Sequence, residues 1–385
     1  MSALQYDRKE FNSFCVLSLL FSSTYSLLYK FTAAPIFSPE IVLPILLVIF
    51  LTNTRNLKYL PFYIIIYLCV VLMFSLVLFE NHPKSVEYYV KLMVFFTIPP
   101  ILYGSLDLEF NKFWEVAKVF ALVNFALLLY LVVFRQDMYL DVEYMNYMTF
   151  GYWMLQSSLV FFIISYRYNS FKYMLLSVFC FLLIINFGSR FAIVSCIIGF
   201  ISIRMLFKGF TIKFALALIS TSIIFLISYM NLSEILYSSI LTLRKLNIEP
   251  ISLVRIYVRL GQTLSESSSG RTELWLNSYD LIQSNPFGYG LINYSQHLDS
   301  LAIFKYPHNI FIQLFLEYGV ILASVLIFFL LFLVLCFFRR ARFEERLLAI
   351  FYLSITSKLL VSGNYMWEAT FWLFLTLILT KVIKN

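Results

Sequence analysis

Long apolar runs, each of about 16 to 29 residues, recur from one end of this chain to the other with short polar segments between them. A bilayer has a hydrocarbon core about 30 Å thick, and a helix needs about 20 apolar residues to cross it. Backbone polar groups inside lipid must be satisfied internally, and runs of this length achieve that as helices. The pattern predicts about twelve spans, at residues 14–31, 36–52, 59–79, 87–106, 113–134, 150–166, 171–187, 191–207, 210–230, 309–338, 347–362 and 366–383.

Composition agrees with a membrane protein. Of the 385 residues, 61% are hydrophobic and 13% are charged. A soluble domain carries about 25% charged residues, so this chain has too few to cover a surface that faces water. The fold class expected is therefore all-α, a polytopic membrane helix bundle.

The basic residues are distributed unevenly between the two sides of the predicted bundle. With the N-terminus inside, the short outer loops hold only Lys30, Lys84, Arg135 and Arg190. Lysine and arginine concentrate in cytoplasmic loops, so both termini are expected in the cytoplasm, and the net charge of +8 needs no nucleic-acid partner. The residues expected at the cytoplasmic ends are Arg8, Lys9, Arg55, Lys58, Lys112, Arg167, Lys172, Arg204, Lys208, Lys213, Arg339, Arg340, Arg342, Arg346, Lys381 and Lys384.

One segment, residues 231–308, is too long and too polar to be an ordinary connection. It divides the chain into N-terminal membrane helices (1–230, about nine spans), a large extracytoplasmic loop (231–308) and C-terminal membrane helices (309–385, about three spans). Such loops are usually functional or disordered. Helical apolar spacing predicts short helices at 236–246 and 272–284, the second ended by Asn285-Pro286. Whether these helices only cover the bundle or carry chemistry stays open at this point.

The apolar segment that follows the loop, residues 310–338, is longer than a simple span requires. At 1.5 Å per residue it would reach about 43 Å, so it must tilt, bend or protrude from the membrane. Its outer third contains Glu317 and Gly319. Glu317 belongs to a group of charged residues inside predicted spans that must pair or face a hydrated cavity; the others are Glu368, Lys91, Lys118 and Lys358.

Three residues on the outer side could carry chemistry. Arg190 lies between two spans at the mouth of the bundle, where it is either functional or a snorkelling arginine at a helix end. Arg271 opens the second loop helix, and its planar guanidinium suits phosphate oxygens, although a surface arginine fits as well. His308 lies where the loop re-enters the membrane, as a candidate general base or a polar anchor.

The order of these residues resembles the O-antigen ligase/polymerase superfamily. Gly188-Ser189-Arg190 is similar to that family's Ser-Arg motif, and His308-Asn309 to Gly319 is similar to the ligase pattern, from which Leu322 departs. The remaining residues of the resemblance are Gly270-Arg271, Trp275, Asn285-Pro286-Phe287-Gly288-Tyr289-Gly290 and Glu317-Tyr318-Gly319.

The resemblance implies a glycosyltransferase of the bacterial inner membrane that needs no metal or other cofactor. Its donor would be a glycan on undecaprenyl pyrophosphate, with Arg190 and Arg271 binding the pyrophosphate, Asn309 among the substrate-binding residues and His308 as general base. Membrane lipid would surround it, and a flippase and a chain-length regulator are candidate partners. The cysteines lie in predicted spans and show no metal-binding spacing.

Three functions compete. A polymerase would use a second lipid-linked repeat unit as acceptor, and a ligase would use the lipopolysaccharide core. The departure at Leu322 favours the polymerase. A transporter for the same lipid-linked glycan would predict repeated halves with interrupted helices, and neither is visible in the sequence.

Overall fold

The fold is taken from a computed structural model of the whole chain. The structure describes residues 2–22, 24–25, 28, 87, 90–106, 108–134, 147–187, 189–214, 216, 220, 232–245, 254, 257–258, 271–291, 293–298 and 306–384. Over these residues the backbone forms helices, turns and loops and no β-strand. The prediction of an all-α membrane bundle is therefore confirmed for the part of the chain that is described.

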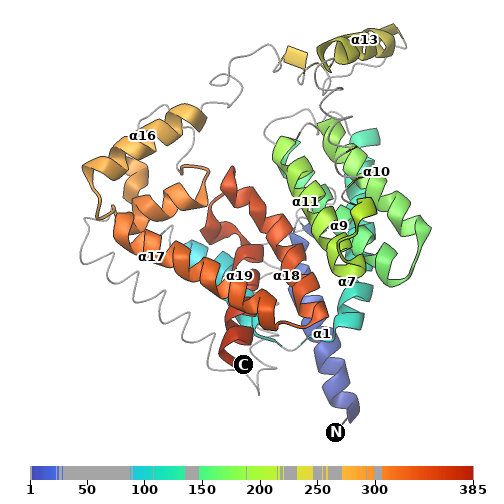
Figure 1. The fold of residues 1–385 in the computed structure, drawn as a ribbon, viewed down its shortest axis with the longest axis horizontal. Helices are drawn as coiled ribbons and strands as arrows, with labels where there is room; N and C mark the ends of the chain where they lie inside the picture. The colour runs from blue at the N-terminus through green and yellow to red at the C-terminus, as the bar shows by residue number, and fades with distance from the viewer. Residues whose placement is uncertain are drawn as a thin grey trace.

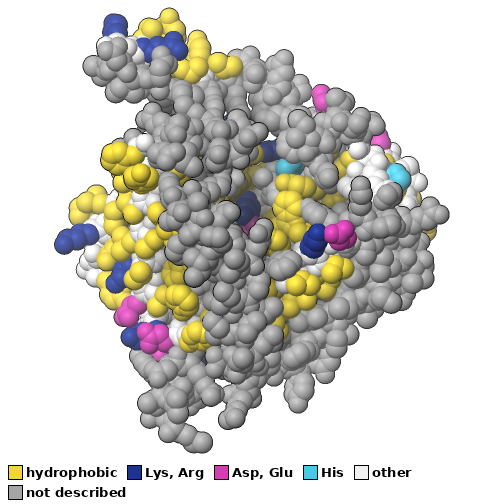
Figure 2. Space-filling model, turned by 180° about the vertical axis from the view of Figure 1, so that it is seen from behind, with side chains coloured by type: hydrophobic (Ala, Val, Ile, Leu, Met, Phe, Trp, Pro, Cys, Tyr) yellow, Lys and Arg dark blue, Asp and Glu magenta, His cyan; other side chains and the backbone are white. Residues whose placement is uncertain are grey.

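Four of the described helices are long and apolar enough to cross a membrane. They are α7 (Phe110–Phe134), α9 (Tyr147–Arg167), α11 (Arg190–Lys208) and α17 (Ile310–Arg340). Shorter apolar helices are α10 (Phe171–Phe187) and α19 (Ala369–Lys384). Seen from one side, hydrophobic side chains cover most of the described surface and charged ones are isolated (Figure 2).

Helix α9 lies at the centre of the N-terminal group of helices, between α7, α10 and α11 (Figure 1). Buried residues make up 78% of its span, against 28% for α7 and for α11. Polar side chains join it to its neighbours: Asn124 Nδ2 donates to Ser157 Oγ at 2.9 Å, and Ser177 Oγ donates to the carbonyl of Ser158 at 2.8 Å. Hydrogen bonds of this kind hold membrane helices together where the hydrophobic effect cannot.

The two ends of the bundle differ in their residues. Both termini lie at one end, opposite the end that carries α16 (Arg271–Ser284) (Figure 1). At the end with the termini, Arg167 pairs with Glu344 at 2.7 Å, and Lys381 pairs with Glu345 at 2.5 Å. Arg167 and Lys381, which were both expected on the same side of the membrane, therefore lie at the same end of the bundle.

Several predicted spans differ in detail from the helices. The expected span 87–106 contains a π-helix, η2 (Met93–Thr97), and then α6 (Ile98–Gly104). The second and third residues of α6 are prolines, which lack N–H donors. At the expected span 347–362, the α-helix ends earlier than predicted: α18 (Phe343–Thr356) is followed by a 3-10 turn, η4 (Ser357–Leu360). The spans expected at 36–52 and 59–79, and two thirds of 210–230, lie outside the described residues.

The long loop contains the helices that its apolar spacing predicted. Helix α13 (Leu232–Lys245) and α16 confirm the two expected helices within one to four residues at each end. A 3-10 turn, η3 (Asn293–Gln296), lies between α16 and α17. A further 3-10 turn, η5 (Tyr365–Trp367), precedes α19.

Helix α17 bends at Gly319, which has non-helical angles of φ 73° and ψ 172°. The backbone groups released by the bend bond to the loop Pro286–Gly290. The amides of Tyr289 and Gly290 donate to the carbonyls of Leu316 (2.7 Å) and Glu317 (3.1 Å), and the amide of Val320 donates to the carbonyl of Pro286 (2.8 Å). The long apolar segment therefore bends, one of the three outcomes predicted, and the loop Pro286–Gly290 is attached at the bend.

Two glycines permit this close contact. A Cβ on Gly319 would lie 2.4 Å from the carbonyl carbon of Phe287, and one on Gly288 would lie 2.5 Å from the amide nitrogen of Gly319. Both residues also have positive φ, which L side chains adopt only with strain. The spacing between the glycine-rich turn and Glu317-Tyr318-Gly319 thus has a structural explanation: the two segments bond to each other through their backbones.

We predict that Gly319→Ala lowers stability by about 2 to 5 kcal/mol, because backbone strain and a clash with immobile backbone add together. Gly209→Ala is a matched control: Gly209 has a φ of 69°, but no described atom lies within 4 Å of its would-be Cβ. It should lose only about 1 kcal/mol. Thermal unfolding of the purified proteins in detergent measures both. Equal losses would show that the contact at the bend contributes nothing.

Candidate functional site

His308 lies directly before α17, at the bundle end that carries α16. Its side chain is buried, with 4% of its surface exposed, and its φ of 55° is positive. Positive φ is uncommon for a residue other than glycine and is found where surrounding structure holds it, often at functional sites. The backbone at the loop exit therefore holds the imidazole inward.

Asn309 ends the loop and caps α17. Its Oδ1 accepts hydrogen bonds from the amides of Phe311 (2.9 Å) and Ile312 (3.2 Å), and its Nδ2 donates to the carbonyl of Leu360 (3.0 Å). The first two bonds satisfy amides that have no partner within the helix. The third joins the start of α17 to η4. These contacts give Asn309 a role in positioning His308.

Aromatic side chains hold the residues before His308 in place. The ring of Tyr306 lies 4.4 Å from the His308 ring and 5.7 Å from Trp367, measured between centroids. On the other side, Trp275 Nε1 of α16 donates to the carbonyl of Pro307 at 2.8 Å. The loop helix α16 and the segment around η5 therefore both contact the two loop residues before His308.

Arg271 is the first residue of α16, and its charge acts on His308. Burial, and then the nearby Arg271 guanidinium, lower the pKa of His308 to about 4. Burial also raises the pKa of Tyr306, against the effect of Arg271. At any pH near neutrality His308 is thus a neutral imidazole with a lone pair that can accept a proton.

Arg190 and Arg271 both lie against the first turns of α9, although they are far apart in sequence. Arg271 Nη2 donates to Met148 Sδ at 3.3 Å. Ser189 precedes the exposed Arg190 and contacts α9 so closely that a Cβ on Gly151 would lie 2.4 Å from the Ser189 Cβ. Met148 and Gly151 are one helical turn apart, so Arg271 and the residue before Arg190 contact the same short piece of α9.

A third cation, Lys358 of η4, also lies at this part of α9. It pairs with Glu368 and lies 5.7 Å from the centroid of the Tyr152 ring. Both members of this pair were predicted to need a partner within the membrane, and the structure identifies that partner, which the sequence could not. Since Glu368 follows Trp367, the pair also belongs to the segment that contacts Tyr306.

Glu317 lies deeper, in the first part of α17, and is 2% exposed. Its carboxylate accepts hydrogen bonds from Gln313 Nε2 (2.9 Å) and Tyr365 OH (2.6 Å). Tyr365 belongs to η5, so Glu317 joins the bent helix to the segment before α19. We interpret Glu317 as a residue that holds the bend, not as one that contacts substrate.

Of the predicted site residues, His308, Asn309 and Arg271 are brought together, and Arg190 directly follows Ser189, which contacts the same part of α9 as Arg271. Gly188 and Gly270 lie outside the described residues. Tyr306 was not predicted, and Lys358 was predicted only as a charge that needs a partner and not as a site residue, because no spacing in the sequence distinguishes either of them. Among the described residues, no three His, Cys, Asp or Glu side chains are grouped to hold a metal ion. The site combines one neutral base with cations, an arrangement that suits transfer from an anionic leaving group.

A comparison with protein families gives a match over residues 175–327 to a family described as O-antigen ligase. The match begins in α10 and ends in α17, and it includes Arg190, Arg271 and His308. No curated protein matches the chain. The part of the chain matched is therefore the part that carries the site.

We predict that Arg271→Gln raises the pKa of His308 above about 4, because the repulsion between two cations is removed, but leaves it below 6.5, because burial remains. The chain has 3 histidines, so selective ¹⁵N-histidine labelling gives few signals to assign during an NMR pH titration. Arg244→Gln, which removes an exposed arginine of α13, is the control and should leave the titration unchanged. An identical His308 midpoint in both variants would contradict the proposed electrostatic contact.

Proposed function

We propose that this chain, which matches a family described as O-antigen ligase over residues 175–327, polymerises lipid-linked oligosaccharide repeat units. The donor would be a glycan on undecaprenyl pyrophosphate at the periplasmic face of the bacterial inner membrane. The acceptor would be a second lipid-linked repeat unit. The observation that carries the proposal is the buried, neutral His308 next to Arg271, at the end of the bundle away from the termini.

In the proposed reaction, a hydroxyl oxygen of the acceptor sugar attacks the anomeric carbon of the donor. The bond from that carbon to the pyrophosphate oxygen breaks, and the electron pair leaves with the lipid diphosphate. A ring nitrogen of His308 takes the hydroxyl proton as the new glycosidic bond forms. The proton then passes to solvent or to the departing diphosphate, and the neutral imidazole is restored.

Arg190 and Arg271 are proposed to bind the diphosphate. Negative charge grows on the leaving group as the bond breaks, and fixed cations in a site shielded from water stabilise that charge. Arginine is suited to this role because its planar fork can donate two parallel hydrogen bonds to phosphate oxygens. The position of both arginines against the first turns of α9 supports their acting on one ligand.

Tyr306, Trp275 and Asn309 are proposed as positioning residues. They contact the His308 ring, the Pro307 carbonyl and the first amides of α17, respectively. Each of these contacts limits movement of the imidazole relative to Arg271. A base that is held in place needs less reorganisation when the acceptor arrives.

A ligase that transfers the glycan to lipid A-core is the second candidate. It is favoured by the description of the matching family and by the His308-Asn309 to Gly319 spacing. The departure from the ligase pattern at Leu322 favours the polymerase. The Leu322 side chain, however, is 48% exposed on α17 and so lies away from the buried cluster. The two functions use the same donor and differ in the acceptor.

We predict that His308→Ala and Arg271→Ala each abolish long glycan chains while the protein stays folded and in the membrane. Loss of the base and loss of a charge that stabilises the leaving group each cost about a hundred-fold or more in rate. Gel analysis of surface glycan in complemented deletion strains measures this. His297→Ala and Arg244→Ala, at exposed positions, are the matched controls and should give normal ladders. Normal ladders in the His308 and Arg271 variants would exclude the mechanism.

Deletion of the gene separates the two candidate functions. We predict surface lipopolysaccharide that carries a single repeat unit on its core, because ligation continues without polymerisation. The alternative outcome, bare core with lipid-linked polymer accumulating in the membrane, would contradict the polymerase and support the ligase.

A further inference from the structure

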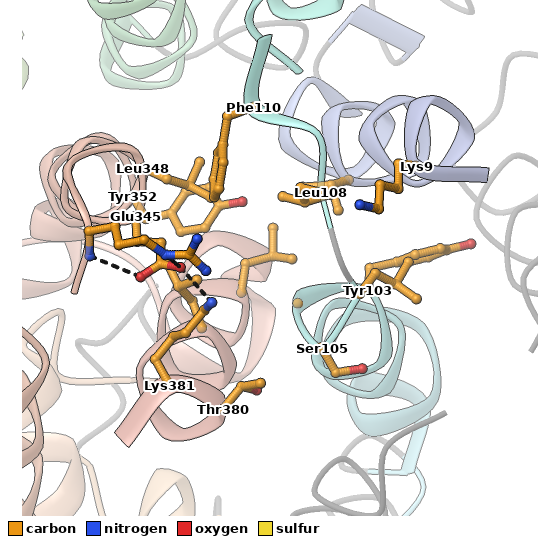
Figure 3. A pocket seen from close by; sticks show the side chains of 16 residues that line it. Lys9, Tyr103, Ser105, Leu108, Phe110, Glu345, Leu348, Tyr352, Thr380 and Lys381 are labelled. Atoms are coloured by element: carbon orange, nitrogen blue, oxygen red, sulfur yellow. Dashed lines mark hydrogen bonds and ion pairs between the residues drawn. The ribbon is translucent and has the colours of Figure 1, made fainter. Parts of the chain in front are cut away.

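A second site lies at the opposite end of the bundle from His308. It is a cavity of about 270 Å³ between α1 (Ser2–Leu20), α6, α18 and α19, near the start of α7 (Figure 3). None of the residues proposed for glycosyl transfer lines it. The lining residues used below are Lys9, Leu348, Leu377, Arg342, Glu345 and Lys381.

The charges that line this cavity do not balance. Three cations, Lys9, Arg342 and Lys381, face one carboxylate, Glu345. Glu345 is 3% exposed, and its Oε1 lies 2.5 Å from Lys381 Nζ and 3.4 Å from Arg342 Nε. In Figure 3, Lys9 lies across the cavity from the pair formed by Lys381 and Glu345. The lining therefore keeps a formal excess of two positive charges, which favours an anionic ligand.

The same cavity has apolar walls. Leu348 of α18 and Leu377 of α19 line it, together with Val16, Leu106, Leu108, Phe110 and Leu373. A small, strongly hydrated anion gains nothing from such walls. A ligand with an anionic group at one end and hydrocarbon next to it would contact both kinds of surface.

The cavity also lies at the level where membrane helices end. Phe110, which begins the membrane-length helix α7, lines it, and so does Arg342, two residues after α17 ends at Arg340. This is the depth at which lipid head groups meet a membrane protein. Basic pockets between helices at this depth bind the head groups of anionic lipids.

We propose that this cavity binds the phosphate head group of an anionic phospholipid from the leaflet on the side of the termini. Lys9 and Arg342 contact the phosphate, while Lys381 remains paired with Glu345. The acyl chains leave along the apolar side chains between α18 and α19. The site is separate from the proposed site of glycosyl transfer, so either proposal can fail without the other.

The test uses the purified full-length protein in a zwitterionic detergent, with its thermal unfolding midpoint followed as lipid is added. Phosphatidylglycerol is expected to raise the midpoint, and phosphatidylcholine is not. Lys9→Glu should weaken the apparent affinity for phosphatidylglycerol about ten-fold or more, because it removes one positive charge from the cavity and adds a negative one. Lys208→Glu, an exposed lysine at the same end that does not line the cavity, is the matched control and should bind as the native protein does.

Lys9 is the residue to change because replacing Lys381 would leave the buried Glu345 without its nearest cation. If Lys9→Glu fails to fold, Arg342→Gln serves instead, because the Arg342 side chain is 83% exposed. Unchanged affinity in the folded variant would overturn the proposal. An equal rise with phosphatidylcholine would overturn it too, and an equal rise with inorganic phosphate would show that the ligand is a free anion and not a lipid.

Discussion

The backbone contact between the loop Pro286–Gly290 and the bend in α17 is the interaction on which the site depends. Inside a membrane-length helix, a break exposes carbonyl and amide groups that lipid cannot satisfy. Here the loop supplies the missing partners, with bonds of 2.7 to 3.1 Å to Leu316, Glu317 and Val320. The bend requires the loop, and the loop is held at one level by the bend. Glycine at 288 and 319 permits both.

This backbone contact affects the proposed chemistry by restricting the positions of Arg271 and His308. Helix α16 precedes the loop, so anchoring the loop also restricts where Arg271, its first residue, can lie. Helix α17 begins at the other side with Asn309 as its cap, and His308 directly before that. One backbone contact thus limits the distance between the proposed base and a proposed phosphate-binding arginine. The Trp275 bond to the Pro307 carbonyl is a second, side-chain connection between the same two elements.

The electrostatics at the two ends of the bundle follow different principles. At the end of His308, burial and then the nearby Arg271 lower the pKa of the imidazole, which leaves it neutral and able to accept a proton. At the end of the termini, arginine and lysine pair with Glu344 and Glu345 and join α9, α18 and α19. The arrangement around His308 destabilises its protonated form. The ion pairs of Glu344 and Glu345 stabilise the packing of the helices. A polytopic protein can therefore place basic residues on both sides, for different reasons.

The sequence by itself determined the membrane class, the helical fold and the two loop helices, and it gave Arg190, Arg271, His308 and Asn309 as candidate site residues. These depend on the length of apolar runs, on their period and on residue chemistry, all of which are local. The sequence could not show that Lys358 pairs with Glu368, that Arg271 and Ser189 contact the same part of α9, or that Tyr306 contacts His308. Such contacts join positions that are 2 to 80 or more residues apart, and only tertiary packing decides which of them meet.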